Sequence, residues 1–280
     1  MKIAVVTGSS TGIGYSTSLH LARHGYRVFA GMRNLAKAEA LREEARAASL
    51  PVEIVELDVV SGDSVKSAFD TVARQGPVDV LVNNAGIGGA SPLEMTPEAE
   101  HRKMFETNYF GAIRCIQEVL PSMRERRQGV IANVTSIAGL VAIPNQVAYS
   151  ASKWALEAAA EALAHEVRRF GIRVVNVEPG VVMTKIFENS AEATRYDKKS
   201  PYQPIMRRNG KFYSAGFRDP ATPPEEVAEK ILEAIESPEY RLRWVVGKDA
   251  VGFHAGRAKI ADEAWVDMGA DLPDEEYNKR

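Results

Sequence analysis

The chain has 280 residues, of which 45% are hydrophobic and 26% are charged, and such a composition is ordinary for a globular protein. Lysine and arginine (35) nearly balance aspartate and glutamate (37), which gives a formal net charge of -2. Because no basic surplus exists to attract a phosphate backbone, we expect no nucleic-acid partner. The one cysteine, Cys115, cannot form an intramolecular disulfide and gives no sign of an oxidising compartment.

Neither a signal-peptide core nor a membrane span is evident. The apolar run at residues 3–6 is short and breaks into glycines, and no stretch approaches the roughly 18 apolar residues of a spanning helix. We therefore expect a cytoplasmic protein without an integral membrane span.

Short runs rich in β-branched residues alternate with longer stretches of helical period. Most of the short runs are apolar throughout, which is typical of parallel strands covered on both faces. We predict strands at residues 3–7, 27–30, 52–57, 78–82, 130–134, 173–177 and 242–246, and helices at 13–24, 35–48, 65–75, 99–126 and 149–170. This alternation predicts an α/β protein: a single Rossmann domain over residues 1–280, whose doubly wound, seven-stranded parallel sheet is flanked by helices.

Two regions depart from the alternation. Residues 184–224 form a long connection, and connections of this length inside a domain are commonly lids or binding loops, so we predict a substrate loop there. Residues 248–280 form a C-terminal tail, and the sequence leaves open whether it docks on the body. The loop is rich in aromatic residues, which favours an apolar substrate or simply anchors the loop: Tyr196, Tyr202, Phe212, Tyr213 and Phe217.

A glycine-rich turn follows the first strand. Gly8, Gly12 and Gly14 permit a tight turn, and they let backbone N–H groups approach a pyrophosphate at the start of the next helix. Alone, such a turn also fits a plain strand-to-helix connection with a helix cap. Its position directly after the first strand favours the cofactor interpretation.

The spacing Thr-Gly-x-x-x-Gly-Ile-Gly at residues 7–14 resembles the motif of the short-chain dehydrogenase/reductase family. The resemblance continues in the family's order over residues 7–184, and loosely, through residues 30–34 and the long loop, it extends to the hydroxysteroid and retinol dehydrogenase branch. The further motifs are Asn83-Asn84-Ala85-Gly86 after the fourth strand, Asn108, Ser136 after the fifth strand, Tyr149-x-x-x-Lys153, and Pro179-Gly180 after the sixth strand.

Tyr149 and Lys153 are four residues apart, which places both on one face of a helix. A tyrosine with a pKa near 10 is a poor base, but a neighbouring ammonium favours its phenolate. Such a tyrosine can donate a proton to a carbonyl or accept one from an alcohol. An isolated pair of this kind more often lies on a solvated face; Ser136, at the end of a buried strand, favours the catalytic interpretation.

The family resemblance implies roles for individual residues. Ser136, Tyr149 and Lys153 correspond to the catalytic serine, tyrosine and lysine, with Ser136 and Tyr149 contacting the substrate. Asn108 corresponds to the residue that holds a water in a proton relay, although it also suits a buried side chain that satisfies backbone groups in a distorted helix. The implied cofactor contacts are Gly8, Ser10, Gly12, Ile13, Gly14, Asp58, Val59, Asn84, Ala85, Gly86, Tyr149, Lys153, Pro179, Gly180, Val182 and Thr184.

The end of the second strand bears on the choice of cofactor. A carboxylate there would bind a ribose 2′-hydroxyl and repel a 2′-phosphate, but residues 29–34 contain no acid. Arg33 instead offers a charged fork suited to phosphate, and Ser10 offers a hydroxyl. We therefore predict NADP(H), with NAD(H) the less favoured alternative, while Arg33 also fits an ordinary surface arginine.

The sequence thus predicts an NADP(H)-dependent oxidoreductase that reduces a ketone or aldehyde or oxidises a secondary alcohol, with Tyr149 as general acid and base. The alternatives are an NADP(H)-sensing binding protein and a sugar-nucleotide epimerase on the same fold. We predict a small-molecule carbonyl or alcohol substrate of bulky, apolar character, and we expect no metal site. We also predict a homodimer or homotetramer formed through the long helices at 99–126 and 149–170.

Overall fold

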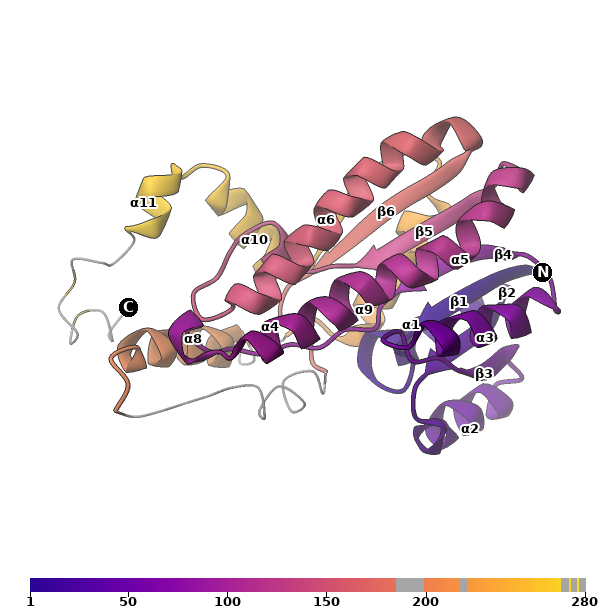
Figure 1. Cartoon of the computed structure of the whole chain (residues 1–280), viewed down its shortest axis with the longest axis horizontal. Helices are drawn as coiled ribbons and strands as arrows, with labels where there is room; N and C mark the ends of the chain where they lie inside the picture. The colour runs from indigo at the N-terminus through magenta and orange to yellow at the C-terminus, as the bar shows by residue number, and fades with distance from the viewer. Residues whose placement is uncertain (185–198, 217–220, 268–271, 273–275, 277–280) are drawn as a thin grey trace.

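The computed structural model describes residues 1–184, 199–216, 221–267, 272 and 276. Its centre is a parallel sheet of seven strands in the order β3-β2-β1-β4-β5-β6-β7 (Figure 1). Each neighbouring pair of strands is parallel. The strands are β1 (Lys2–Thr7), β2 (Tyr26–Met32), β3 (Val52–Glu56), β4 (Val78–Asn83), β5 (Gly129–Val134), β6 (Ile172–Pro179) and β7 (Arg243–Val246).

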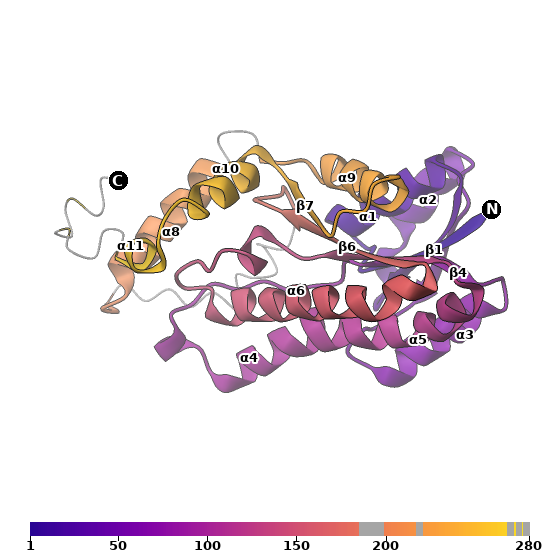
Figure 2. The ribbon, with the colours of Figure 1, turned by 90° about the horizontal axis from the view of Figure 1, so that it is seen from above.

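Helices cover both faces of the sheet (Figure 2). One face is covered by α1 (Gly12–Arg23), α2 (Glu39–Ala47) and α9 (Pro224–Glu236), and the other by α3 (Gly62–Ala73), α5 (Gly111–Arg126) and α6 (Val147–Val167). Beyond one end of the sheet lie α4 (Glu98–Phe105), α8 (Gln203–Gly216), α10 (Lys248–Arg257) and α11 (Asp262–Val266). The crossovers therefore form the two layers that a doubly wound sheet requires.

The apolar strands explain why both faces must be covered. Val5 packs into the cluster with α3, α5 and α6, whereas the next residue, Val6, packs into the cluster with α1 and α9. Successive side chains of a strand point to opposite faces, so an apolar run leaves no face for water. Both valines are buried.

The strand order reverses between β1 and β4, which are neighbours in the sheet but are separated along the chain by β2 and β3. The connections after these two strands leave in opposite directions and open a crevice at their carboxyl ends. The glycine-rich turn and the Asn83-Asn84-Ala85-Gly86 segment follow β1 and β4, so the fold brings these two motifs to the same point.

The seven predicted strands are confirmed to within two residues at their ends. Two predicted helices are interrupted. The one at 35–48 consists of a short 3-10 turn, Leu35–Lys37, followed by α2. The one at 99–126 contains a π-helical turn, Glu106–Phe110, between α4 and α5. Short 3-10 turns also lie at Leu93–Met95, Ile137–Gly139 and Arg168–Phe170.

Both irregular regions contain helices that the sequence pattern did not reveal. The 184–224 connection includes α8, a helix that the sequence pattern did not predict, and the role of this connection as a substrate loop stays a prediction. Tyr202 lies among the described residues, whereas Tyr196 and Phe217 lie outside them. In the tail, Ala250 of α10 is 1% exposed and packs with Ile137 and Val141, so the tail docks on the body at its beginning. The described helices include none with the length and apolar character needed to cross a bilayer.

Candidate active site

The glycine-rich turn is built so tightly that side chains cannot replace its hydrogens. Gly8 has a φ of 70°, and a Cβ there would lie 2.8 Å from the Ala85 Cα. At Gly14 a Cβ would lie 2.5 Å from both the Asn84 Nδ2 and the Gly8 carbonyl oxygen. The glycines therefore let the turn close against the segment that follows β4.

Thr7 ties these two segments together. Its hydroxyl oxygen accepts hydrogen bonds from the Asn84 N–H at 3.0 Å and the Ala85 N–H at 2.9 Å. In return, the Asn84 side-chain amide donates to the Thr7 carbonyl at 2.9 Å. Asn84 therefore holds the turn in shape, a role that adds to its predicted place in the cofactor groove. Sequence reasoning missed Thr7, although it opens the motif.

The first turn of α1 suits an anionic group. The capping residue Thr11 makes no side-chain hydrogen bond to the helix, and the first turn contains no acidic residue. The initial N–H groups of a helix lack partners within the helix and attract phosphate. Ser10 and Ile13 are partly exposed beside this turn. A Cβ on Gly12 would lie 2.9 Å from the Thr184 Cγ2, so the segment after β6 closes over the same turn.

Arg33 and Asp58 lie after β2 and β3, farther from the sheet switch. Arg33 is exposed, and its side chain has no hydrogen-bond or ion-pair partner among the described residues. Asp58 accepts a hydrogen bond from the Val60 N–H at 3.1 Å, which makes it a turn residue as well as a predicted cofactor contact. Val59 is buried, and its carbonyl accepts a hydrogen bond from Arg114. Val59 thus supports the groove from within the core.

Ser136 and Tyr149 meet at the carboxyl end of β5. The Ser136 hydroxyl oxygen accepts a hydrogen bond from the Ala138 N–H at 3.1 Å, which leaves its own hydrogen to donate. Burial raises the pKa of Tyr149, and a hydrogen bond with Ser136 opposes that shift. Without a further positive charge, the Tyr149 phenol stays protonated at neutral pH.

Lys153 lies one helical turn from Tyr149, and its ammonium nitrogen is 5.9 Å from the centroid of the Tyr149 ring. That nitrogen donates to the Val134 carbonyl at 2.9 Å, and the residue is 5% exposed. Burial lowers the pKa of Lys153 to about 8, while the charge of Glu157 acts in the opposite direction. Lys153 is therefore a buried ammonium that remains mainly charged at neutral pH.

Asn108 occupies the π turn between α4 and α5. Its side-chain oxygen accepts from the Ile87 N–H at 2.8 Å, and its amide donates to the Ile87 carbonyl at 3.0 Å. The same amide donates to the Ser152 hydroxyl at 3.0 Å. Asn108 therefore does satisfy backbone groups from a distorted helix. A Cβ on Gly86 would lie 3.3 Å from the Asn108 oxygen and 3.6 Å from the Lys153 nitrogen, so Asn108 and Lys153 face the same space.

The segment after β6 is held by a residue that the sequence did not reveal. Asp249, in the first turn of α10, accepts a hydrogen bond from the Val181 N–H at 2.7 Å. A Cβ on Gly180 would lie 2.2 Å from an Asp249 oxygen. Val182 pairs with Thr222 in a short parallel bridge. Since Pro179 ends β6, this network directs the chain from the sheet toward the glycine turn.

The predicted residues thus gather along the carboxyl ends of neighbouring strands, with Arg33, Asp58 and Val59 at the β2–β3 side and the catalytic candidates at the β5 side. Thr7, Asp249 and Glu157 were missed. The spacing of Glu157, four residues after Lys153, was the one available signal. Across the part of the chain that the structure describes, no three His, Cys, Asp or Glu side chains gather as metal ligands would.

Comparison with known proteins agrees with this geometry. A family model described as short chain dehydrogenase matches residues 2–195. The chain belongs to the short-chain dehydrogenase family. Human retinol dehydrogenase 8 is 36% identical over 258 residues, which are 86% of this chain and 80% of that protein. Relatives of this kind confirm the resemblance to the retinol and hydroxysteroid dehydrogenase branch.

Solved structures agree. A short-chain dehydrogenase from Streptomyces avermitilis is 33% identical, with a TM-score of 0.82, and the match covers 96% of this chain and 98% of that one. An actinorhodin polyketide ketoreductase solved with NADPH is 29% identical, with a TM-score of 0.75, and the match covers 89% and 97% of the two chains. This short-chain dehydrogenase is therefore an oxidoreductase of a family that uses nicotinamide cofactors.

Proposed function

We propose that this short-chain dehydrogenase reduces a ketone or aldehyde, or oxidises the corresponding secondary alcohol, with NADP(H) as cofactor and Tyr149 as general acid and base. The observation that carries the proposal is the group of Ser136, Tyr149 and Lys153 at the end of β5, in which Ser136 and Lys153 are buried and Tyr149 is partly exposed. These three side chains lie where a doubly wound sheet binds its ligand.

The glycine turn fits a dinucleotide. Methyl groups at Gly8, Gly12 and Gly14 would each fall within 3 Å of a neighbouring atom, so the turn has no room for a side chain at these three positions. A pyrophosphate can approach such a turn closely and meet the N–H groups that open α1. When bound, the nicotinamide ring supplies or accepts the hydride.

In the reducing direction, the Tyr149 hydroxyl donates its proton to the carbonyl oxygen of the substrate. The Ser136 hydroxyl donates a hydrogen bond to the same oxygen, because its lone pair is already engaged by the Ala138 N–H. The Lys153 ammonium stabilises the phenolate that remains. In the oxidising direction, the phenolate accepts the proton of the alcohol.

The preference for NADP(H) rests on Arg33. Its guanidinium is exposed beside the end of β2 and has no partner among the described residues, so it is available to a 2′-phosphate. The adjacent Asn34 side chain accepts from the Ala36 N–H and shapes the turn without adding a negative charge. The similar ketoreductase that was solved with NADPH supports the same preference for NADP(H).

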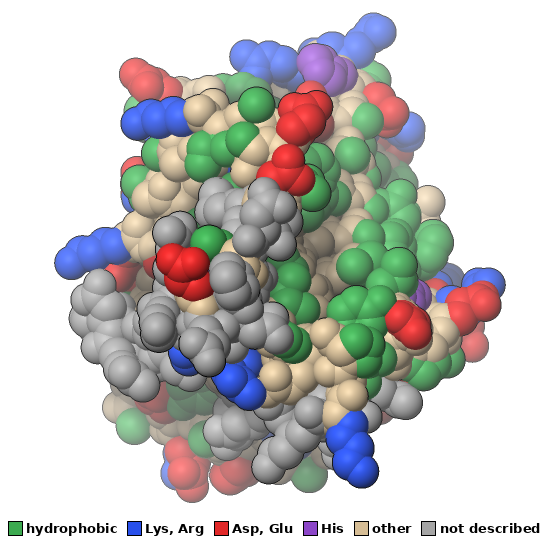
Figure 3. All heavy atoms as spheres, turned by 90° about the vertical axis from the view of Figure 1, so that its left-hand side faces the viewer, with side chains coloured by type: hydrophobic (Ala, Val, Ile, Leu, Met, Phe, Trp, Pro, Cys, Tyr) green, Lys and Arg blue, Asp and Glu red, His purple; other side chains and the backbone are tan. Residues whose placement is uncertain are grey.

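We further propose an apolar, bulky substrate. Ile137 follows Ser136 directly and packs with Val141 and Ala250, and Phe253 and Trp265 extend this cluster toward the surface. Seen from the end of the molecule where α8 and α11 lie, apolar side chains gather beside a hollow (Figure 3). Burial of apolar substrate surface there would contribute about 25 cal/mol per Å².

Assembly into a homodimer or homotetramer is part of the same proposal. Phe110, Val147 and Trp154 are large apolar side chains on neighbouring helices, and they are 46%, 43% and 48% exposed. Sedimentation of the purified chain at micromolar concentration tests this point, since a monomer would contradict it. The cytoplasmic location stays a prediction.

The reaction is tested with NADPH and a panel of steroid, retinoid and small aliphatic carbonyls. We expect turnover of bulky apolar members, and a loss of about a thousandfold in kcat for Tyr149→Phe with an unchanged Kd for NADPH. Tyr26→Phe is the control, because this buried tyrosine bonds to Glu236 away from the site. Wild-type turnover by Tyr149→Phe would falsify the assignment of the proton donor, and exclusive turnover of small polar carbonyls would contradict the apolar substrate.

A further inference from the structure

A row of buried asparagines crosses the catalytic half of the sheet. Asn83 of β4, Asn133 of β5 and Asn176 of β6 are direct partners in the strand register. The Asn83 amide donates to the Asn133 oxygen at 3.0 Å, and the Asn133 amide donates to the Asn176 oxygen at 3.1 Å. Each asparagine is at most 4% exposed. Buried polar side chains need hydrogen-bond partners. In this row each amide donates to the next asparagine, so the hydrogen bonds run in one direction, from Asn83 to Asn176.

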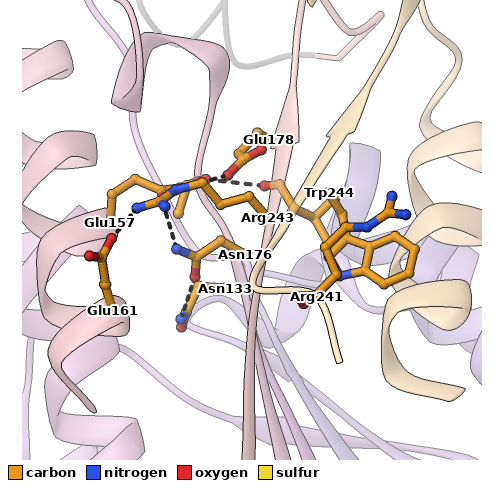
Figure 4. Close-up of polar contacts among 10 residues, drawn as sticks. Asn133, Glu157, Glu161, Asn176, Glu178, Arg241, Arg243 and Trp244 are labelled. Atoms are coloured by element: carbon orange, nitrogen blue, oxygen red, sulfur yellow. Dashed lines mark hydrogen bonds and ion pairs between the residues drawn. The ribbon is translucent and has the colours of Figure 1, made fainter. Parts of the chain in front are cut away.

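The row ends on Glu157 of α6 (Figure 4). The Asn176 amide donates to one carboxylate oxygen of Glu157 at 2.7 Å, and the Thr135 hydroxyl donates to the other at 2.6 Å. Arg243, the register partner of Asn176 on β7, adds a charged hydrogen bond at 3.0 Å. Glu157 is 3% exposed. Three donors, two on β6 and β7 and one directly after β5, therefore fix one buried carboxylate.

Arg243 does not face Glu157 alone. It also pairs with the exposed Glu161 at 2.6 Å, and Glu178 of β6 lies 3.8 Å from its guanidinium. Glu178 is completely buried, and neither of its oxygens has a hydrogen-bond partner among the residues that the structure describes. Burial, together with the negative charge of Glu157, raises the pKa of Glu178 to about 9. At neutral pH Glu178 is therefore uncharged, and the Arg243 charge is shared by Glu157 and Glu161.

The same carboxylate acts on the catalytic lysine. Tyr149, Lys153 and Glu157 follow one another at intervals of four residues along α6, so they lie on one helical face. Lys153 bonds to the carbonyl of Val134, and Glu157 bonds to the side chain of the next residue, Thr135. Both charged groups are thus anchored to consecutive residues at the end of β5.

Gly139 allows this anchoring. A Cβ there would lie 3.1 Å from the Glu157 side chain and 3.2 Å from the Lys153 carbonyl. Since Gly139 belongs to the short turn that begins after Ser136, the helix face that carries Lys153 and Glu157 packs directly against the serine segment.

We propose that Glu157 is a positioning residue of this enzyme: held by the asparagine row and by Arg243, it keeps Lys153 in place and cationic for proton transfer at Tyr149. The inference rests on the proposed function of Tyr149 and Lys153. The charged and titratable groups that face Glu157 among the described residues are Lys153 and Glu161 on its own helix, Glu178 on β6 and Arg243 on β7.

The test is the pH dependence of kcat/KM for carbonyl reduction. Reduction needs a protonated Tyr149 beside a charged Lys153, so activity falls on the alkaline side as Lys153 loses its proton. Glu157→Gln removes the negative charge that opposes this loss, and we expect the alkaline limb to move toward acid by about one pH unit. Glu161→Gln is the matched control, since it also contacts Arg243 but is exposed, and its profile should coincide with the wild type.

A double variant separates charge from hydrogen bonding. Glu157→Gln alone sets the glutamine amide against the Asn176 donor and can destabilise the fold. Glu157→Gln combined with Asn176→Asp restores a donor and an acceptor at that contact, keeps an acceptor for Asn133, and moves the negative charge away from Lys153. We expect this variant to melt near the wild type and still to show an acid-shifted limb, smaller than that of the single variant. A wild-type limb in the folded double variant overturns the proposal.

A readout independent of turnover distinguishes this inference from the reaction itself. With lysine labelled at Cε, the Lys153 resonance is assigned by its loss in Lys153→Met, and its titration midpoint should fall in both Glu157 variants. An unchanged midpoint contradicts the charge coupling. If the wild-type protein reduces no carbonyl and the Lys153 midpoint still falls in the Glu157 variants, the proposed function is wrong while the charge coupling between Glu157 and Lys153 stands.

Discussion

The two halves of the sheet differ in how their candidate ligand-binding residues are held. On the β1–β3 side, the candidate cofactor contacts are mainly the glycine turn and partly exposed side chains such as Ser10 and Asp58, and the exposed Arg33 has no hydrogen-bond or ion-pair partner among the described residues. On the β4–β7 side, Asn108, Lys153 and Glu157 are each at most 5% exposed and are hydrogen-bonded within the protein. Under the proposed function, cofactor preference therefore depends on side chains that the fold does not need, whereas the chemistry depends on side chains that the fold holds fixed.

The sharpest test of this contrast is at Lys153, where we expect the largest effect. Lys153→Met leaves the neighbouring phenolate without its cation, and kcat for reduction should fall about a hundredfold or more. Lys66→Met removes an exposed lysine that pairs with Asp70, and its kcat should stay at the wild-type value. Steady-state kinetics of both variants measure the difference, and comparable losses would remove the distinction between the two kinds of lysine.

The glycine turn comes next in expected effect. Gly14→Ala places a methyl group 2.5 Å from the Asn84 side chain and the Gly8 carbonyl, so the turn must open. We expect a rise of about tenfold or more in the Kd for NADPH and a loss of about 1–3 kcal/mol in unfolding free energy. Gly252→Ala in α10 meets nothing within 4 Å and should be neutral or slightly stabilising. Fluorescence titration with NADPH and thermal melts compare the two variants. An unchanged Kd for NADPH in Gly14→Ala would contradict the role of the glycine turn in binding the cofactor.

Arg33 should show a smaller and more selective effect. Arg33→Ala is expected to raise the KM for NADPH about tenfold and to leave the KM for NADH nearly unchanged, because the exposed guanidinium would contact only the 2′-phosphate. Stability should not change, since the side chain makes no contact within the described residues that the fold could lose. If both cofactors respond equally, the assignment to the phosphate is wrong.

The smallest expected effect concerns stability at Glu178. Its pKa rises from 4.5 to about 9 on folding, so the unfolded chain ionises first and the carboxyl lowers the stability of the folded state progressively as pH rises between these values. Glu178→Gln removes this dependence. The melting temperature of the variant relative to wild type should therefore be higher at pH 8 than at pH 5, with each kcal/mol moving it by about 2–4 °C.

Glu161→Gln serves as the comparison for that measurement. This residue is exposed, and its hydrogen bond with Arg243 lowers its pKa, so its carboxyl is ionised throughout pH 5–8. Its melting temperature relative to wild type should be the same at both pH values. A similar trend in the two variants would show that Glu178 carries no special pH dependence.

What the sequence could predict follows from how local each signal is. The apolar runs that became β1, β4, β5 and β6 are signals within a few residues, and the motifs after them were placed correctly at the carboxyl ends. Asp249 lies 68 residues from Val181, to which it bonds, and no pattern within one segment connects the two. Helix α8 has a mixed polar and apolar sequence that Gly210 interrupts. Because such a sequence is also typical of a loop, the helix could not be recognised from the pattern.

Glu157 was missed for a different reason. Its spacing from Lys153 was visible, but a glutamate on a long helix is usually solvated, and only the strand order brings Asn176 and Arg243 to it. The polarity of the interior at this point is a product of the register of four strands. Prediction from the sequence therefore reached the residues that are proposed to carry the reaction but not those that hold them.

The π turn at Glu106–Phe110 has a consequence for chain length. A π turn contains one residue more than an α turn, and that extra residue is what rotates Asn108 toward Ile87. Removing a single residue between 106 and 110 would restore an ordinary α turn and leave α4 and α5 nearly in register, because the π turn absorbs its extra residue within one turn. The two helices would keep their packing, whereas the Asn108 side chain would lose its direction toward Ile87, because the number of residues in this turn sets where that side chain points.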